Sequence, residues 1–163
     1  MARRASSGFS AINYNSGDQS LLDSLKPLWE ALNTHHHNLS VNFKPYYEEM
    51  TFKRRKASLL KKAKSAKMQV DVAEEELSGQ NIGYCISSVD SFKIGEIYSI
   101  FVGVVHRGLG IGDALVRRAL AWMEKNGAEE KVVQVAAGNE DAFDFYARYG
   151  FLVRKTLLKQ VEV

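Results

Sequence analysis

The stretch formed by residues 102–112, VGVVHRGLGIG, constrains the fold more than any other part of the chain. It follows a β-like run, EIYSIFV, and precedes an amphipathic segment, residues 113–126. Glycine tolerates positive φ and lets a ligand approach the main chain, so such a loop can aim backbone N–H groups at an anion. The positive end of the following helix dipole would lie at the same place. The sequence therefore predicts a strand, a glycine loop and a helix that converge on one phosphate-binding site.

Two common phosphate-binding motifs do not fit this stretch. A P-loop carries a lysine and a hydroxyl residue after its last glycine, whereas here Asp113 and Ala114 follow Gly112. The dinucleotide fingerprint GxGxxG belongs to the first βαβ unit of a sheet. Gly108, Gly110 and Gly112 read GxGxG and come two thirds of the way along the chain. The sequence therefore disfavours both a P-loop and a Rossmann dinucleotide site.

The pattern RxxGxG at residues 107–112 resembles the acetyl-CoA pyrophosphate loop of the GNAT N-acetyltransferase superfamily. Asn139, Ala142 and the run FYARYGF, residues 145–151, resemble a second signature of that superfamily at the expected distance. The resemblance covers residues 95–151, about a third of the chain. It implies transfer of an acetyl group from acetyl-CoA to a primary amine, by direct attack in a ternary complex and without a metal.

The composition is that of a single globular domain. The chain has 163 residues, 45% of them hydrophobic, which is enough for a substantial core. We expect residues 1–8 to form a flexible N-terminal segment and residues 9–163 to form the acetyltransferase domain. A single cysteine, Cys85, excludes an internal disulfide, and no apolar run reaches the ~20 residues that span a bilayer. We therefore expect a cytoplasmic protein with no membrane partner.

Hydrophobic periodicity predicts an α/β fold in one domain. The predicted elements in chain order are strand 9–15, helices 21–32 and 45–65, strands 68–74, 81–89 and 95–102, helix 113–125, strand 132–137, helix 139–149 and strand 151–161. The order is therefore β-α-α-β-β-β-α-β-α-β. The resemblance adds a twisted, mixed, mostly antiparallel sheet, flanked by about four helices and splayed to admit the cofactor. We expect the last strand to close the sheet, and its pairing at an open edge would give a homodimer.

The resemblance also implies how the cofactor binds. The backbones of Val102 and Val104 would hold the pantetheine amides, and the loop amides would receive the pyrophosphate. The residues with implied cofactor contacts are Val102, Val104, Arg107, Gly108, Leu109, Gly110, Ile111, Gly112, Asp113, Asn139 and Tyr146. Because backbone groups make the loop contacts, we expect the side chains of Leu109 and Ile111 to be replaceable. Asn139 has a second interpretation, as the N-cap of the helix that follows it.

The resemblance places a general acid at Tyr146. A phenol with an ordinary pKa of ~10 stays protonated at neutral pH and can donate a proton to the departing thiolate. The alternative is a core tyrosine packed beside Phe145 and Phe151. Glu96 is the candidate general base, as strand carboxylates are in some members of the superfamily, although it could equally be an edge charge. Tyr98 shares the strand parity of Glu96 and could line the acceptor side.

Residues 52–67 carry eight of the 22 basic residues and no acidic one. One interpretation is a solvated helix face with Leu59 and its apolar neighbours turned inward, and the other is an electrostatic patch for RNA or an acidic partner. The net charge is only +3 and no aromatic stacking residues are interleaved, so we do not expect a nucleic-acid partner. If this helix borders the acceptor pocket, it disfavours a strongly cationic acceptor.

The triplet His35, His36 and His37 does not have the spacing of a metal site. Adjacent side chains on a helix point ~100° apart, so three in a row cannot readily close on one ion. We interpret the triplet as a polar helix end and expect no metal in this protein. Because the resemblance places the N-terminal helices over the acceptor pocket, one of these histidines could line it or act as the base.

Two functions remain open at this point. The first is acetyl transfer from acetyl-CoA to an amine acceptor, either a small molecule or a protein. The second is a regulatory or interaction module that binds CoA and catalyses weakly. Turnover of any amine would exclude the second function.

Overall fold

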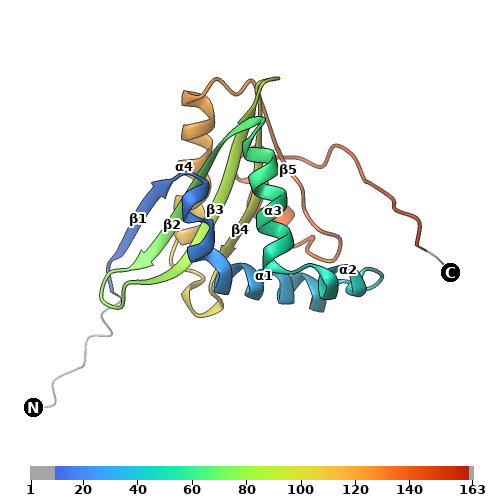
Figure 1. The fold of residues 1–163 in the computed structure, drawn as a ribbon, viewed down its shortest axis with the longest axis horizontal. Coiled ribbons are helices and arrows are strands. Elements are labelled where there is room, and N and C mark those ends of the chain that lie inside the picture. Colours follow the sequence, from blue (N-terminus) through green and yellow to red (C-terminus); the bar gives the residue numbers. More distant parts are fainter. Residues whose placement is uncertain (1–9, 162–163) are drawn as a thin grey trace, which may run out of the picture.

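The sheet has five strands within residues 10–161, the part of the chain that the computed structural model describes (Figure 1). In chain order they are β1 (Ile12–Gly17), β2 (Ala66–Glu75), β3 (Gln80–Asp90), β4 (Ile94–Val102) and β5 (Glu130–Val133). The same order runs across the sheet. Strands β1 to β4 pair antiparallel, and β5 pairs parallel with β4. The predicted α/β fold with a mixed, mostly antiparallel sheet is confirmed.

Helices cover both faces of this sheet. The α-helices are α1 (Lys26–Leu39), α2 (Lys44–Glu49), α3 (Phe52–Ala63), α4 (Ile111–Lys125) and α5 (Ala142–Ala147), and two 3-10 helices are η1 (Gln19–Leu25) and η2 (Val104–His106). Figure 1 shows α1 and α3 in front of the sheet and α4 behind it. The two faces of the sheet therefore carry separate layers of helix.

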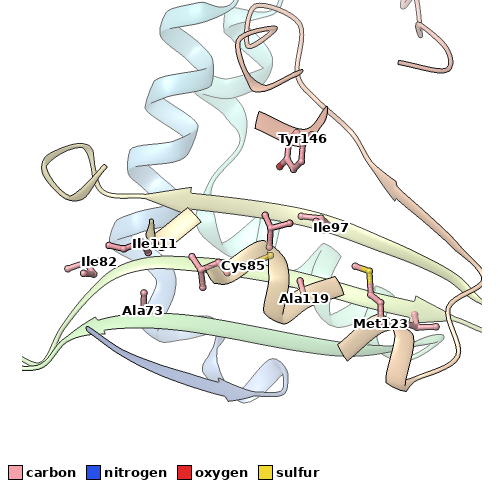
Figure 2. Packing of buried hydrophobic residues seen from close by; sticks show 11 residues of the cluster. Ala73, Ile82, Cys85, Ile97, Ile111, Ala119, Met123 and Tyr146 are labelled. Atoms are coloured by element: carbon pink, nitrogen blue, oxygen red, sulfur yellow. The ribbon is translucent and has the colours of Figure 1, made fainter. Parts of the chain in front are cut away.

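The central strand β3 packs against both layers, because successive side chains of a strand point to opposite faces. Cys85 belongs to a buried cluster with Leu115 of α4, part of which Figure 2 shows. Its neighbours Tyr84 and Ile86 belong to a second cluster, which includes Trp29 of α1. One strand thus anchors two hydrophobic cores, one on each face.

Helix α4 forms because its apolar residues recur at helical spacing and face the sheet. The buried residues of this helix are Ile111, Leu115, Val116, Ala119 and Met123. All five belong to the cluster that contains Cys85. The predicted amphipathic helix after the glycine loop is confirmed.

The predicted helix 45–65 is two helices. Helix α2 ends before Met50, whose backbone is extended, and α3 begins after Thr51. The Thr51 hydroxyl accepts a hydrogen bond from the Arg54 N–H at 3.2 Å and caps the new helix. The first helix also differs from the prediction, since residues 19–25 are 3-10 and the α-helix runs on through the histidine triplet.

The predicted last strand is absent from the described residues. Residues 151–161 have no regular secondary structure, and Leu157 and Leu158 are 88% and 89% exposed. A strand needs a partner, and β5 offers an edge of only four residues. The homodimer expected from this strand therefore loses its structural basis.

Smaller corrections concern the ends of two elements. The predicted strand 132–137 is Glu130–Val133, and the predicted helix 139–149 is Ala142–Ala147. The flexible segment expected at residues 1–8 lies outside the described residues. Within residues 10–161, no helix has the length and apolar character needed to cross a bilayer.

Matched leucine substitutions test the assignment of core and surface. Leu115 is fully buried in the first cluster, whereas Leu157 is 88% exposed. We expect Leu115→Ala to lower the free energy of unfolding by about 2–5 kcal/mol, and Leu157→Ala to change it by less than about 0.5 kcal/mol. Denaturant unfolding measures both. A loss above about 1 kcal/mol for Leu157→Ala would show that the C-terminal segment packs.

Candidate active site

Strands β4 and β5 pair over a short length and then separate. The register runs from Ile94 opposite Glu130 to Ile97 opposite Val133. Strand β4 continues to Val102, so residues 98–102 have no strand neighbour on this side in the described part of the chain. An unpaired strand edge offers backbone N–H and C=O groups to an extended ligand. The predicted splay of the sheet lies here.

Gly138 fixes the path of the segment that leaves β5. Its φ is +94°, and a Cβ at this position would overlap the carbonyl oxygen of Leu39 at the end of α1. Only glycine meets both conditions. The Gly138 N–H donates to Glu140 Oε1 at 2.9 Å, which holds the turn. The segment after β5 is therefore pressed against α1 instead of continuing beside β4.

Tyr98 forms a bulge at the start of the unpaired edge. Ile97 lies opposite Ser87 and Ser99 lies opposite Ile86, so Tyr98 is an extra residue without a partner on β3. Arg55 of α3 satisfies its carbonyl, since the Arg55 Nη2 donates to the Tyr98 oxygen at 3.0 Å. Bulges commonly redirect a side chain beside an active site.

A cavity of about 920 Å³ opens next to this bulge. It is lined by residues of α1, α2 and α3, by residues 96–99 of β4 and by residues 134–136 after β5. Glu96 lies in its wall with its side chain 16% exposed. The Gln134 Nε2 donates to Glu96 Oε1 at 3.1 Å, and the Lys62 Nζ lies 3.7 Å from Glu96 Oε2. The carboxylate is thus held between α3 and the segment after β5.

One histidine of the triplet lines the cavity. His36 stacks on Tyr47 with ring centroids 5.8 Å apart, and its Nδ1 is buried without a hydrogen-bond partner among the described residues. Burial, aided by the neighbouring His35, lowers the pKa of His36. His37 instead contacts Glu48, with 3.0 Å between Nε2 and Oε1. Across residues 10–161, no three His, Cys, Asp or Glu side chains are grouped to hold a metal ion.

The glycine loop lies at the other end of the unpaired edge. Gly108 and Gly110 both have φ of +78°, and Gly110 is the N-cap of α4. The helix has no side-chain cap, and its first hydrogen bond joins the Ala114 N–H to the Gly110 carbonyl at 3.0 Å. The first N–H groups of a helix have no partner within the helix, so this end can receive an anion.

Ile111 and Gly112, which the sequence placed in the loop, belong to the first turn of α4. Gly112 does not have a positive φ, and a Cβ there would lie 3.5 Å from the Phe145 ring, an ordinary contact. Ile111 is 1% exposed and belongs to the core, whereas Leu109 is 37% exposed. The expectation that the Ile111 side chain is replaceable is therefore wrong, because its removal would leave a cavity in the core.

Arg107 braces the turn between β4 and the loop. Its Nε donates to the Val102 carbonyl at 3.2 Å, and its guanidinium lies 5.5 Å from the centroid of the Phe101 ring. The Val104 carbonyl accepts from the Arg107 N–H at 3.3 Å, and the Val104 side chain is 70% exposed. The Arg107 side chain thus binds the Val102 carbonyl, which the resemblance assigns to pantetheine.

Residues 26–151 match the model of the Acetyltransferase (GNAT) family. The chain belongs to this family. It is 34% identical, over 82 residues, to an uncharacterized N-acetyltransferase of Methanocaldococcus jannaschii. That match covers 47% of this chain and only 36% of the length of the curated relative.

Solved structures of GNAT-like fold match nearly the whole chain. A putative acetyl transferase from Pyrococcus furiosus has a TM-score of 0.68 at 25% identity, over 92% of this chain and 100% of that chain. The aminoglycoside N-acetyltransferase AAC(6')-Iy in complex with CoA has a TM-score of 0.69 at 16% identity, over 97% and 98% of the two chains. The second likeness concerns the fold alone.

In this GNAT-family chain Tyr146 lies in the first hydrophobic cluster. It is 7% exposed, and its ring packs edge-on against Phe145 at 5.2 Å and Phe151 at 5.9 Å between centroids. Figure 2 shows it on α5, beyond the edge of β4 and away from β3. Burial raises the pKa of its hydroxyl. Tyr146 does not belong to the described wall of the 920 Å³ cavity, so the structure does not bring it together with Glu96 there.

Asn139 is not a helix N-cap. Helix α5 begins at Ala142, and Asp141 stands at the N-cap position without a side-chain hydrogen bond. The Asn139 N–H donates to the Ala136 carbonyl at 3.0 Å, and its own carbonyl accepts from the Ala142 N–H at 3.0 Å. The N-cap interpretation is therefore wrong, and contact with a cofactor stays a prediction.

Sequence reasoning missed the side chains that surround Glu96. Arg55, Lys62 and Gln134 come from α3 and from the segment after β5, far from Glu96 in the chain. The only signal was the density of basic residues in residues 52–67, which did not say which of them face the cavity. Helical spacing distinguishes the cavity-facing from the outward-facing residues of this segment only when one inward residue, such as Leu59, is known.

Asp113, in the first turn of α4, offers a test of the electrostatics beside the loop. Hydrogen bonds from the Tyr149 hydroxyl and the Arg117 guanidinium hold the pKa of the Asp113 carboxyl below its ordinary value. Burial, and then the contact with Asp113, raise the pKa of Tyr149 to about 12. Tyr149 therefore donates a hydrogen bond to the charged form of the carboxyl.

We expect Tyr149→Phe to raise the pKa of Asp113 part of the way to its ordinary value, because the bond from Arg117 remains. A carboxyl with a depressed pKa stabilises the fold above its ordinary pKa and loses that effect as the pH falls. The variant should therefore show a smaller difference in the free energy of unfolding between neutral and acidic pH. NMR titration of the carboxyl measures the pKa, with Tyr46→Phe as control. An unchanged pKa would contradict the assignment.

Proposed function

We propose that this chain transfers the acetyl group of acetyl-CoA to a primary amine of a small molecule or protein. The observation that carries the proposal is the unpaired edge of β4, which runs from the glycine loop to the cavity that contains Glu96. Membership of the acetyltransferase family supports the same activity. An extended thioester on this edge would have its phosphates at one end and its acetyl group at the other.

The residues at the loop fit the cofactor. The backbone N–H groups from Arg107 to Asp113 would bind the pyrophosphate, helped by the positive end of α4. The backbones of Val102 and Val104 would hold pantetheine, and Asn139 and Tyr146 would contact it from the other side. Acetyl-CoA supplies the thioester carbonyl that the amine attacks. Arg107 must share or release the Val102 carbonyl when pantetheine binds, which makes its side chain available to the phosphates.

Glu96 is our candidate for the general base. An amine attacks only in its neutral form, and a carboxylate in the cavity wall can accept the proton directly or through water. The Gln134 amide and the Lys62 ammonium fix the position of this carboxylate. Tyr146 is our candidate for the acid, because a hydroxyl with a raised pKa stays protonated and can donate to the departing sulfur.

One observation favours the alternative of a CoA-binding module with weak catalysis. Tyr146 is packed between Phe145 and Phe151 in the core, and its hydroxyl makes no hydrogen bond with another described residue. A tyrosine in such a place can serve packing alone. Turnover decides between the two functions, since both require binding of acetyl-CoA.

The identity of the amine acceptor is open. The structural relative with CoA acts on aminoglycosides by its name, and the chain shares only its fold at 16% identity. A small molecule or a protein amine therefore remains the proposed acceptor class.

Matched glycine variants test the cofactor site. Gly110 and Gly79 both have positive φ and open space around them, but Gly79 lies in the turn between β2 and β3. We expect both Gly→Val changes to cost stability by about 1–2 kcal/mol, because left-handed backbone is strained for other residues. Only Gly110→Val should weaken binding of acetyl-CoA, by about tenfold or more, since its side chain would stand where the phosphates approach. Calorimetric titration measures both affinities, and equal affinities would exclude the loop as the phosphate site.

Two conservative variants test the proposed acid and base. We expect Glu96→Gln and Tyr146→Phe each to lower kcat by about 100-fold or more while the Kd of acetyl-CoA stays within about twofold. Release of CoA thiol is followed with a panel of glycinamide, spermidine, L-glutamate and a dipeptide. Glu129→Gln is the control, because Glu129 pairs with Lys93 away from the cavity. Full activity of either variant would remove that residue from the mechanism.

A further inference from the structure

The cavity beside Glu96 has a pronounced positive charge. Within residues 10–161, its wall contains four cationic side chains, Arg55, Lys61, Lys62 and Lys64, against the single carboxylate of Glu96. His36 adds no charge near neutral pH, because burial lowers its pKa. An acceptor with several ammonium groups would be repelled here.

The carboxylate of Glu96 does not neutralise this group. It is already contacted by Lys62 at 3.7 Å. Among the described residues, Lys61, Lys64 and Arg55 take part in no ion pair. Arg55 is half-buried and uses Nη2 for the Tyr98 carbonyl, which leaves other guanidinium N–H groups for a ligand.

The part of the cavity wall around Glu96 lies away from the glycine loop, where we place the phosphates of CoA. A strand rises about 3.3 Å per residue, so Glu96 lies roughly 20 Å from Val102, where the loop begins. The loop has its own anion-binding groups in the N–H donors of α4. The cationic wall is therefore free to act on the other substrate.

Two buried polar atoms in the cavity wall favour a polar ligand. His36 Nδ1 and the Tyr98 hydroxyl are both buried and have no hydrogen-bond partner within the described residues. Both residues line the cavity, from α1 and β4 respectively. Buried polar atoms without partners are costly unless a ligand or water satisfies them.

We infer that the acceptor is an amine that carries an oxyanion, a carboxylate or a phosphate, and that Arg55, Lys61 and Lys62 bind this group. The inference rests on the proposed acetyl transfer. The guanidinium of Arg55 suits an oxyanion because its N–H groups can donate in parallel to two oxygens. The amine of the same molecule would then lie toward Glu96. Amino acids and acidic peptides belong to this class, and polyamines do not.

Paired acceptors that differ in one anionic group test the inference. L-Phenylalanine is compared with L-phenylalaninamide, and O-phosphoethanolamine with ethanolamine, so that carboxylate and phosphate are examined separately. We expect kcat/KM to be about tenfold or more higher for the anionic member of at least one pair, and the preference to weaken as salt rises. Equal rates, or a preference for the neutral member, would overturn the inference and leave acetyl transfer intact.

Neighbouring residues on α3 provide matched variants. Arg55→Gln and Lys61→Gln should reduce the preference severalfold, mainly through KM. Arg54→Gln and Lys53→Gln should leave it unchanged, because Arg54 binds the Glu49 carbonyl and neither residue lines the cavity. The same loss in all four variants would mean that the general charge of α3, and not the cavity wall, selects the acceptor, and would overturn the inference.

A binding measurement separates the inference from the proposed function. N-acetyl-L-phenylalanine and its amide are titrated into the protein and into Arg55→Gln by calorimetry, which requires no turnover. Tighter binding of the acid, lost in Arg55→Gln, supports the oxyanion site even if no acceptor is acetylated, in which case the proposed activity fails alone. Equal binding of acid and amide overturns the oxyanion site whatever the turnover.

Discussion

The early separation of β5 from β4 is the constraint on which the rest of this structure depends. Pairing over the whole length of β4 would satisfy its edge and close the sheet, and nothing extended could then bind there. Because the pairing stops at Val133, one strand offers main-chain groups between a glycine loop and a cavity. The site is thus a consequence of where backbone hydrogen bonding ends, and the side chains refine it.

The two faces of the sheet serve this edge in different ways. On one face α4 packs through a continuous apolar stripe, which holds its uncapped N-terminus firmly at the end of β4. On the other face η1, α1 and α3 share a second set of core residues, and α1 and α3 also contribute residues to the wall of the cavity. In our proposal, the cofactor and the acceptor therefore bind against separate helical layers.

Much of the fold was predictable because its signals are local. The run from Glu96 to Asn126 contains the strand, the loop and the helix within one stretch of sequence, and the strand and helix were found within two residues of their predicted bounds. The alternation of the hairpin strands is equally local. The break at Thr51 also has a local signal, because threonine is a favoured N-cap residue and its hydroxyl caps α3.

The remaining features depend on contacts between distant residues. A segment such as residues 151–161 has strand-like alternation, but it becomes a strand only where an edge is available, and β5 is too short. The wall around Glu96 combines α3 with the segment after β5, so no single window of sequence contains it. The partner of Arg107 was equally hidden, because hydrogen bonding to the Val102 carbonyl depends on the turn between them.

Gly138 acts on the opening beside β4 through its backbone alone. The backbone of Gly138 lies so close to Leu39 that a Cβ would overlap the Leu39 carbonyl, so this position has no side chain that could contact a substrate. The opening therefore depends on backbone geometry, whereas the side chains of α1 and α3 that face the cavity can be substituted without changing it. If the proposed function is correct, substitutions on those helices would change the acceptor while the glycine loop proposed to bind acetyl-CoA stays the same.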